Sequence, residues 1–426
     1  MQILSVRGGA PLRGSIPVSG AKNSVLPILA ACAVCRGVSV LHNCPDISDV
    51  GDTLEMLRCL GCRAERRGGS LIVDAQTLCG WQLPAQYAGR LRSSVLFLGA
   101  LLARMGRARI ALPGGCPLGK RPIDLHVLAL QTLGAQVAVG RHFAECRAEE
   151  LRGGRIRLPF ASVGATENAI LAAVGCDGET VIENAAREPE IGDLVRFLRA
   201  AGAQIEQNGG EIHIQGGAPL HGATFTILPD RIETATYLCA AAACGGDVTL
   251  RRTDGRTLEP VLDVLRASGC EITQSGDTLR LCSDGGLRAP GAIETAPYPG
   301  FPTDAQAIVM AALLRARGRT VFTETIFEDR FRHIAELRKF GAAVTFSGRQ
   351  AWLDGVSALH GANVRAEDLR GGAALVIAAL SAHGASQIAG VKHILRGYDN
   401  LAGKLQILGG DIKYVEIPDK MLYNTQ

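Results

Sequence analysis

The sequence predicts a mixed α/β protein of two domains, each built from three repeated β/α units with helices inside and sheets outside. A helix end with a leucine four residues before a glycine recurs six times along the 426 residues, and successive glycines lie 67 to 73 residues apart. The residues after each glycine alternate as in a hairpin with one buried face. Ala-rich helices with few polar side chains are too apolar for a surface. These three observations predict the layering.

The repeats follow one another in order. Their helix-ending glycines are Gly61, Gly134, Gly202, Gly269, Gly341 and Gly409. A helix C-terminus often requires a left-handed residue, which glycine supplies without steric cost. Residues 203–214 illustrate the hairpin pattern, and residues 305–314 and 371–380 illustrate the apolar inner helices. Six units of about 70 residues exceed one compact core, so we expect two domains of three units each with the active site in a cleft between them.

Composition excludes several classes of protein. The 45 Lys and Arg nearly balance 41 Asp and Glu, and aromatic residues make up only 4%, so we expect no nucleic-acid partner. The longest apolar stretches, Leu26–Cys35 and Ala235–Cys244, are about half as long as a membrane helix requires, so no membrane span is expected. The N-terminus does not resemble a secretion signal, which makes the cytoplasm the expected location. No exposed apolar helix face is identifiable, so we expect a monomer.

The 13 cysteines are interpreted as small apolar residues of a reduced protein. Cys32, Cys35, Cys59 and Cys62 form two C-x-x-C pairs that imitate a four-cysteine zinc site. The first pair lies in an apolar helical run and the second closes a helix, so packing in the core is favoured over zinc. The histidines lack paired metal spacing, and no metal or other cofactor is expected.

Residues 112–126 form a Gly- and Pro-rich segment with one cysteine and two cations. Its glycine spacing before Lys120 imitates a phosphate loop, but Arg121 stands where Ser or Thr would hold magnesium, and prolines remove amide donors. Another interpretation is a surface loop whose cysteine is incidental. A third is an active-site lid in which the cations and backbone amides lower the pKa of Cys116 from about 8.5 and activate its thiol. The segment alone leaves the last two open.

The chain resembles the family of enolpyruvyl transferases that act on UDP-N-acetylglucosamine. Eight segments in order along nearly the whole chain carry the resemblance: Ser19–Asn23, Leu112–Cys116, Gly119–His126, Ser162–Thr166, Glu183–Glu190, Leu228–Thr234, Phe301–Asp304 and Asp368–Arg370. The resemblance implies an inside-out α/β barrel of two threefold domains. It places residues 22–229 in one domain and residues 1–21 with 230–426 in the other.

The implied reaction adds the sugar 3'-hydroxyl to C2 of phosphoenolpyruvate and then expels phosphate, which opens peptidoglycan precursor synthesis. The resemblance makes Cys116 the general acid or transient nucleophile, and also the target of fosfomycin. Asp304 accepts the hydroxyl proton, while Lys22 and Arg396 act on phosphoenolpyruvate. The residues that the resemblance assigns to substrate binding are Lys22, Asn23, Arg92, Arg121, Pro122, Ile123, Asp124, Leu125, Ser162, Val163, Gly164, Asp304, Ile326, Arg370 and Arg396. Asp49 is a further polar candidate.

Two residues depart from the family pattern. Phe160 stands where a lysine is common near the uridine diphosphate, and Leu395 replaces an aspartate before Arg396. Neither change removes a proposed catalytic residue, so an active enzyme is expected. The alternatives are a transferase acting on shikimate 3-phosphate, and a non-catalytic or weakly active paralogue that binds the UDP-sugar.

Overall fold

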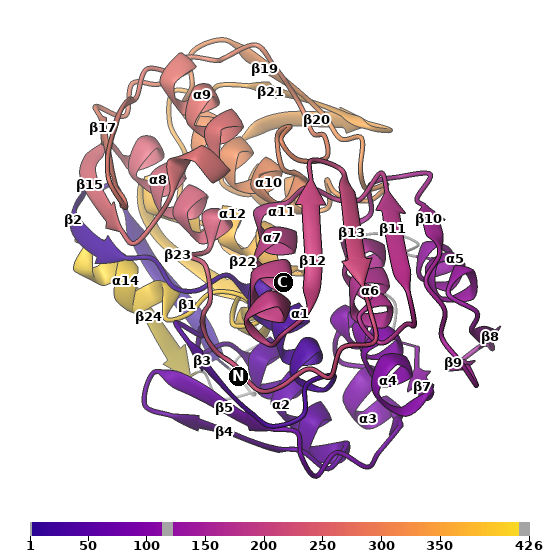
Figure 1. Cartoon of the computed structure of the whole chain (residues 1–426). Coiled ribbons are helices and arrows are strands. Elements are labelled where there is room, and N and C mark those ends of the chain that lie inside the picture. Colours follow the sequence, from indigo (N-terminus) through magenta and orange to yellow (C-terminus); the bar gives the residue numbers. More distant parts are fainter. Residues whose placement is uncertain (1, 113–121, 417–426) are drawn as a thin grey trace. The chain divides into compact units, whose positions relative to one another are not determined.

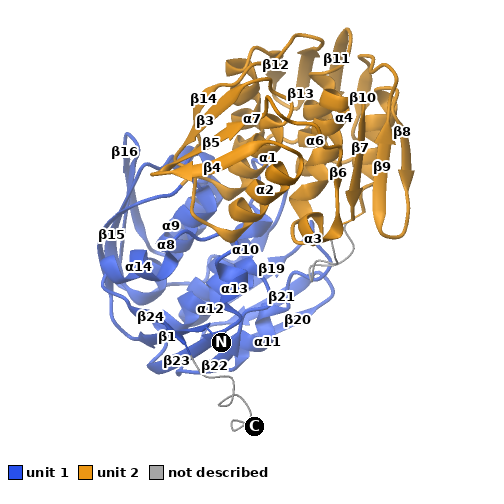
Figure 2. Ribbon diagram, turned by 90° about the horizontal axis from the view of Figure 1, so that it is seen from below, with its two compact units in different colours: residues 1–19, 117–119, 229–426 blue, residues 20–116, 120–228 orange. Residues whose placement is uncertain are grey.

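The computed structural model describes residues 2–112 and 122–416. The chain forms two compact units (Figure 2): residues 2–19 and 229–416 belong to unit 1, and residues 20–112 and 122–228 belong to unit 2. Cys116 and Arg121 lie outside the described residues.

Unit 2 contains three repeats of one helix, strand, helix and hairpin. Its first helices are α1 (Lys22–Cys32), α4 (Phe97–Met105) with the preceding 3-10 turn η1 (Arg92–Leu96), and α6 (Val163–Ala173). Its second helices are α2 (Ser48–Cys59), α5 (Asp124–Thr132) and α7 (Pro189–Ala200), and a short α3 (Ala85–Ala88) lies between repeats.

Three four-stranded sheets cover these helices. The first, in the order β14-β3-β5-β4, comprises β3 (Val38–His42), β4 (Arg63–Arg67), β5 (Ser70–Asp74) and β14 (Thr224–Thr226). The second, β6-β7-β9-β8, comprises β6 (Gln82–Leu83), β7 (Arg107–Ala111), β8 (Gln136–Val139) and β9 (Phe143–Arg147). The third, β10-β11-β13-β12, comprises β10 (Arg155–Arg157), β11 (Glu179–Glu183), β12 (Gln204–Asn208) and β13 (Glu211–Gln215), and Figure 1 shows it lying over α6 and α7.

Unit 1 repeats the same plan. Its first helices are α8 (Arg231–Cys244), α10 (Thr303–Ala312) with η3 (Leu313–Arg315), and α12 (Leu369–Ser381). The other helices are η2 (Gly255–Thr257), α9 (Glu259–Ala267), α11 (His333–Arg338), α13 (Val391–Ile394) and α14 (Leu401–Ile407).

In unit 1, a strand from the N-terminal end of the chain completes the sheet of the last repeat. The sheet β16-β17-β15-β2 comprises β2 (Leu12–Pro17), β15 (Gly246–Arg251), β16 (Glu271–Ser275) and β17 (Thr278–Ser283). The sheet β18-β19-β21-β20 comprises β18 (Ala292–Glu294), β19 (Arg319–Thr323), β20 (Ala343–Ser347) and β21 (Gln350–Asp354). The sheet β22-β23-β1-β24 comprises β1 (Gln2–Gly8), β22 (Asn363–Arg365), β23 (Gly384–Ala389) and β24 (Asp411–Glu416).

The predicted layering is confirmed. Every residue of α12 after Leu369 is buried, and α10 is buried from Ala305 onward, because neither helix has a polar face to turn toward water. The six helix-ending glycines all have left-handed backbones, with φ between 90° and 108°. Each of the first five is followed by the hairpin of its repeat, and Gly409 is followed by β24, which pairs with β1. The glycine spacing therefore located all six repeats.

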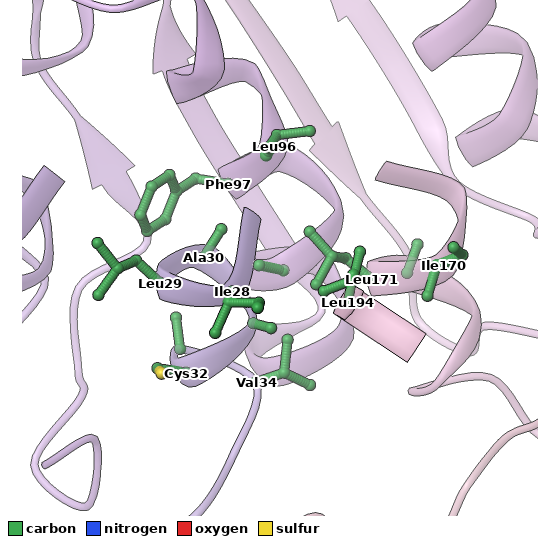
Figure 3. Packing of buried hydrophobic residues seen from close by; sticks show 14 of the residues in the cluster. Ile28, Leu29, Ala30, Cys32, Val34, Leu96, Phe97, Ile170, Leu171 and Leu194 are labelled. Atoms are coloured by element: carbon green, nitrogen blue, oxygen red, sulfur yellow. The ribbon is translucent and has the colours of Figure 1, made fainter. Parts of the chain in front are cut away.

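The core of unit 2 is formed by helices of all three repeats. Figure 3 shows Leu29 of α1, Phe97 of α4 and Leu171 of α6 among the buried apolar side chains of this core. Helices α4 and α6 approach so closely that a Cβ on Gly99 would lie 2.4 Å from the Asn168 carbonyl oxygen. Glycine is therefore required at residue 99.

The cysteine prediction needs one correction. Cys32, Cys35 and Cys62 are buried as expected, but Cys59 is exposed at the end of α2, where its side chain points away from the amphipathic helix's buried face. Burial raises the pKa of Cys35 to about 12, which suits an inert apolar side chain. Over residues 2–112 and 122–416, no three His, Cys, Asp or Glu side chains form a group suited to a metal ion. In the same part of the chain, no helix combines the length and hydropathy needed to cross a membrane.

Candidate active site

Lys22 is the first residue of α1, and its ammonium forms an ion pair with a carboxylate at the start of α2. The Lys22 Nζ atom lies 2.7 Å from Asp49 Oδ2, and the two side chains are 13% and 3% exposed. The first turn of a helix favours a negative charge, so Asp49 is stable at this position. Asp49 thus fixes the direction of the Lys22 ammonium. Asn23 follows Lys22 in the first turn of α1.

Arg92 lies beside the candidate residues at the start of α5. It is the first residue of η1, and its Nη2 atom donates to the Pro122 carbonyl oxygen at 3.1 Å. Pro122 and Ile123 lead directly into α5, which begins at Asp124. The structure therefore brings together Arg92 and the segment 122–125, which are 30 residues apart in the chain.

A buried amide, Asn168 of α6, joins three candidate segments of unit 2. Its side-chain oxygen accepts from the Gly99 backbone N–H at 2.7 Å, and its nitrogen donates to the Val95 carbonyl at 3.1 Å. The same nitrogen donates to His126 Nδ1 at 3.0 Å, which assigns the ring proton to Nε2. All hydrogen-bonding groups of the amide are engaged, so η1, α4, α5 and α6 are held in one arrangement.

The first turn of α6 carries Ser162, Val163 and Gly164. Ser162 caps the helix, because its Oγ atom accepts from the Ala165 N–H at 3.4 Å. The His126 ring packs against Gly164, where an added Cβ would lie 3.2 Å from Cε1. Segments 122–125 and 162–164 therefore meet through His126. A helix N-terminus with free backbone amides attracts anions, phosphate groups above all.

Because of His126, we expect the free energy of unfolding to fall in acid. Burial, with Arg92 as a second cause, lowers the pKa of His126 to about 4. Between pH 6.5 and 4 the unfolded chain takes up a proton that the folded chain excludes, so the unfolding free energy falls as pH falls, by about 3 kcal/mol at pH 4. Urea unfolding at pH 7 and pH 4.5 measures this slope.

The variant His126→Gln should show a shallower slope than the wild type. Part of the slope should persist, because burial also lowers the pKa of His333 in unit 1 to about 4. His142→Gln is the control, since that ring is exposed in the turn between β8 and β9. Equal slopes for wild type and His126→Gln would contradict the assignment.

In unit 1 the Asp304 carboxylate is bound by two buried arginines. Arg330 Nη2 lies 2.8 Å from Oδ1, and Arg370 Nη2 lies 2.9 Å from Oδ2; the two arginine side chains are only 4% and 5% exposed. Arg330 also donates to the Thr303 carbonyl oxygen at 3.1 Å. Each carboxylate oxygen therefore has its own charged donor, a strong arrangement for orienting the group.

The electrostatics of this cluster keep Asp304 ionised. Burial raises the pKa of the Asp304 carboxyl, but Arg370 and Arg330 outweigh burial and hold the pKa well below its usual value. Burial likewise lowers the pKa of Arg370, and Asp304 outweighs it, so the pKa of Arg370 is raised. The cluster therefore contains one carboxylate and two guanidinium groups at every pH of interest.

Glu324 connects Ile326 to the start of α10. Its Oε1 atom accepts from the Ile326 N–H at 2.9 Å, and its Oε2 atom accepts from Thr303 Oγ1, also at 2.9 Å. Glu324 is 1% exposed. Ile326 is thus tied through one side chain to Thr303, the neighbour of Asp304.

Arg370 also reaches the segment that carries Arg396. Its Nη1 atom donates to the Tyr398 hydroxyl at 3.4 Å, and that hydroxyl lies 2.8 Å from Thr236 Oγ1. Tyr398 is fully buried two residues after Arg396. Unit 1 therefore places Asp304 and Arg370 in the first turns of α10 and α12, with Ile326 tied to α10 through Glu324 and with Arg396 following α13.

Comparison with known proteins decides the family. The family model described as EPSP synthase (3-phosphoshikimate 1-carboxyvinyltransferase) matches residues 6–405. A protein of Caldanaerobacter subterraneus subsp. tengcongensis named UDP-N-acetylglucosamine 1-carboxyvinyltransferase 2 is 44% identical over 408 residues, 96% of this chain and 98% of its own. The chain belongs to the enolpyruvyl transferase family. A UDP-N-acetylglucosamine 1-carboxyvinyltransferase 1 of Halalkalibacterium halodurans is also 44% identical, over 427 residues, 100% of this chain and 97% of its own.

Solved enolpyruvyl transferases share the fold. The enolpyruvyl transferase NikO from Streptomyces tendae matches 98% of this chain and 99% of its own with a TM-score of 0.88 and 28% identity. An EPSP synthase from Acinetobacter baumannii matches 98% of this chain and 100% of its own with a TM-score of 0.73 and 20% identity, a likeness of fold. The predicted inside-out α/β barrel of two threefold units is confirmed.

Sequence reasoning missed several residues that position this enolpyruvyl transferase site. The sequence did not single out Arg330, which binds Asp304, or Asn168 of α6. For His126 the sequence excluded a metal role and indicated no other role. The available signal was the run of polar residues Thr166, Glu167 and Asn168 within an inner helix whose other residues are small or apolar.

The two departures from the enolpyruvyl transferase pattern lie at defined places. Phe160 is 47% exposed, and its carbonyl oxygen accepts from the Ser162 N–H at 2.7 Å, so its backbone adjoins the start of α6. Leu395 ends α13 and packs partly buried against the core of unit 1. An apolar side chain thus stands two residues before Ser162, and another stands directly before Arg396, where the family pattern has charged residues.

Proposed function

We propose that the protein transfers the enolpyruvyl group of phosphoenolpyruvate to the 3'-hydroxyl of UDP-N-acetylglucosamine and releases phosphate. The observation that carries the proposal is 44% identity across nearly the whole chain to two proteins that bear the name of this activity. The charged groups at the first turns of the inner helices support it, because the reaction handles two polyanions. Peptidoglycan precursor synthesis, a cytoplasmic location and a monomeric state remain predictions.

In unit 2, the proposed role of the helix ends is to bind anions. The amides of the first turn of α6, capped by Ser162, suit the diphosphate of the UDP-sugar. Lys22 and Arg92 supply positive charge for phosphoenolpyruvate, and Asp49 holds the Lys22 ammonium in place. Segments 122–125 and 162–164, which meet through His126, are assigned to the uridine part of the same substrate.

In unit 1, the proposed role of Asp304 is to orient the attacking hydroxyl. Its low pKa makes it a weak base for an alcohol, so it accepts the proton as the bond from the hydroxyl oxygen to C2 forms. C3 gains a proton in this addition. C3 then loses a proton while the bond from C2 to the phosphate oxygen breaks, which restores the double bond. Arg370 and Arg396 are assigned to the developing charge.

Cys116 is proposed as the acid or transient nucleophile at phosphoenolpyruvate, and Arg121 as a ligand of its phosphate. Both lie outside the described residues, so the proposal for them rests on the resemblance. The mechanism requires no metal, since arginines can offset the phosphate charge.

Phosphate release tests the proposal. The wild type should release phosphate from phosphoenolpyruvate with UDP-N-acetylglucosamine and not with shikimate 3-phosphate, and Cys116→Ala should lose at least 99% of the rate. Release with shikimate 3-phosphate would favour the other transferase. Binding of the UDP-sugar without release would favour a non-catalytic protein, in which Phe160→Lys and Leu395→Asp are the changes to test for restored turnover.

A further inference from the structure

Within residues 2–112 and 122–416, the chain passes directly from one unit to the other at residues 19–20 and 228–229. Residues 19–21 and 228–230, here called the paired connection, are hydrogen-bonded to each other. The Ala21 N–H donates to the Leu228 carbonyl at 2.8 Å, and the Asp230 N–H donates to the Ser19 carbonyl at 2.8 Å. The two strands of the connection therefore form a short antiparallel pair, and a change in one is transmitted to the other.

A buried network in unit 1 holds the Ser19 end of this pair. The Ser19 N–H donates to Glu233 Oε2 at 2.8 Å, and its hydroxyl donates to Asp399 Oδ2 at 3.2 Å. The Lys404 ammonium donates to Ser19 Oγ at 2.6 Å and to Glu233 Oε1. Lys404 and Glu233 are 11% and 3% exposed at the side chain. A lysine of α14 and a glutamate of α8 thus clamp one residue of the connection.

Unit 2 holds the other end of the pair in a similar way. Asp193 of α7, which is 1% exposed at its side chain, accepts from the Leu228 N–H at 3.1 Å and from the Ser24 hydroxyl. Leu228 is the last residue of unit 2 before the chain leaves it, and Ser24 lies in the first turn of α1. In each unit, therefore, a buried carboxylate holds the paired connection. Burial of a carboxylate is costly, which argues that this rigidity has a use.

Lys22 and Asn23 begin α1 immediately after the connection, so its backbone sets where their side chains start. We propose that Lys404 is a positioning residue of the enolpyruvyl transfer, acting through Ser19 on Lys22 and Asn23; this inference rests on the proposed function. The Lys404 side chain makes two contributions. Its charge favours the ionised form of the buried Glu233, and its N–H groups fix the Ser19 hydroxyl.

The direction of the Glu233 titration supports this assignment. Burial raises the pKa of the Glu233 carboxyl, and Lys404 opposes that rise. Without the ammonium, Glu233 would take up a proton more readily and hold the Ser19 N–H more weakly. The Lys404 ammonium also lies 6.0 Å from the centre of the buried Tyr237 ring. Bulk water therefore does not easily take the place of this ammonium.

The test separates positioning from stability by using two variants. Lys404→Met leaves Glu233 buried without its cation and should lower both the melting temperature and kcat. Lys404→Met combined with Glu233→Gln removes both charges, which should recover most of the melting temperature. In this double variant kcat for phosphate release should stay at least tenfold below that of the wild type. Lys339→Met is the matched control, because Lys339 forms an exposed pair with Glu336 on the surface of the same unit.

Hydrogen exchange of backbone amides gives a readout that does not depend on turnover. Exchange at Ser19, Ala21 and Asp230 should be at least tenfold faster in the double variant than in the wild type, with Lys339→Met unchanged. Recovery of kcat to within twofold of the wild type, or unchanged exchange at these amides, would overturn the proposal. If the wild type itself releases no phosphate, the proposed function fails while faster exchange still supports the hold of Lys404 on the connection.

Discussion

Asp304→Asn should lose turnover by a factor on the order of 10² to 10⁴, the usual range for removing a group that accepts a proton in the transition state. The amide has nearly the same shape, so it keeps one acceptor for a guanidinium. It carries no charge, and the buried Arg330 and Arg370 then face each other without a carboxylate to offset them. The hydroxyl of the acceptor also loses its anionic partner.

The same variant should be less stable by about 3 kcal/mol at neutral pH, because a buried charge cluster loses one partner. The sign of the pH dependence follows from the low pKa of Asp304. A depressed pKa stabilises the folded state above about pH 4, the unfolded value, and this contribution is lost as pH falls toward the folded value. The difference in unfolding free energy between wild type and Asp304→Asn should therefore shrink below about pH 4.

Asp354→Asn is the matched control for this prediction. Asp354 also bonds an arginine through both oxygens, with Arg319 Nε at 2.7 Å and Nη2 at 2.8 Å, but the pair lies exposed on the outer sheet of the same unit. Solvent screens an exposed pair, so turnover and stability should change little. Steady-state phosphate release and urea unfolding measure both effects. Equal turnover of wild type and Asp304→Asn would remove Asp304 from the reaction.

The repeats could be read from the sequence because their signal is local. A glycine that ends a helix, as at Gly61 and Gly341, is required by its own backbone angle and needs no knowledge of distant residues. The interior position of α12 also follows from its own composition. These features depend on neighbours within about ten residues, and the structure agrees with all of them.

The arrangement around the candidate site could not be read in this way, since it depends on contacts between distant parts of the chain. Arg330 meets Asp304 across 26 residues, and Lys404 meets Ser19 across 385. Charged side chains such as Arg330 are usually exposed, so their burial is visible only once the helices are packed. The resemblance gave Asp304 and Arg370 their place in the site, but not the second arginine that holds Asp304.

Asn168→Leu should destabilise unit 2 by roughly 3 to 6 kcal/mol. The side chains are similar in volume, so the loss is one of hydrogen bonds and not of packing. The Gly99 N–H, the Val95 carbonyl and His126 Nδ1 each lose a buried partner, and each such group costs about 1 to 3 kcal/mol when left unsatisfied. Urea unfolding of the variant measures the sum, and Asn208→Leu at the exposed end of β12 is the control.

The consequence for function should appear in the KM for the UDP-sugar. Asn168 holds His126, and His126 lies between the start of α5 and the first turn of α6, so its loss loosens both proposed uridine segments. A rise in KM of about tenfold is expected, with a smaller change for phosphoenolpyruvate. If the KM for the UDP-sugar does not change, the uridine site lies elsewhere.

Asn168→Asp tests the same contact through the titration of His126. The carboxylate can still accept from the Gly99 N–H, but it cannot donate to Nδ1, and its charge favours a protonated ring. The pKa of His126, about 4 in the wild type, should therefore rise in this variant. NMR of the ring protons measures the change. A new carboxylate in contact with the imidazole must shift the pKa of that ring. An unchanged His126 pKa would therefore show that Asn168 does not set the protonation state of His126.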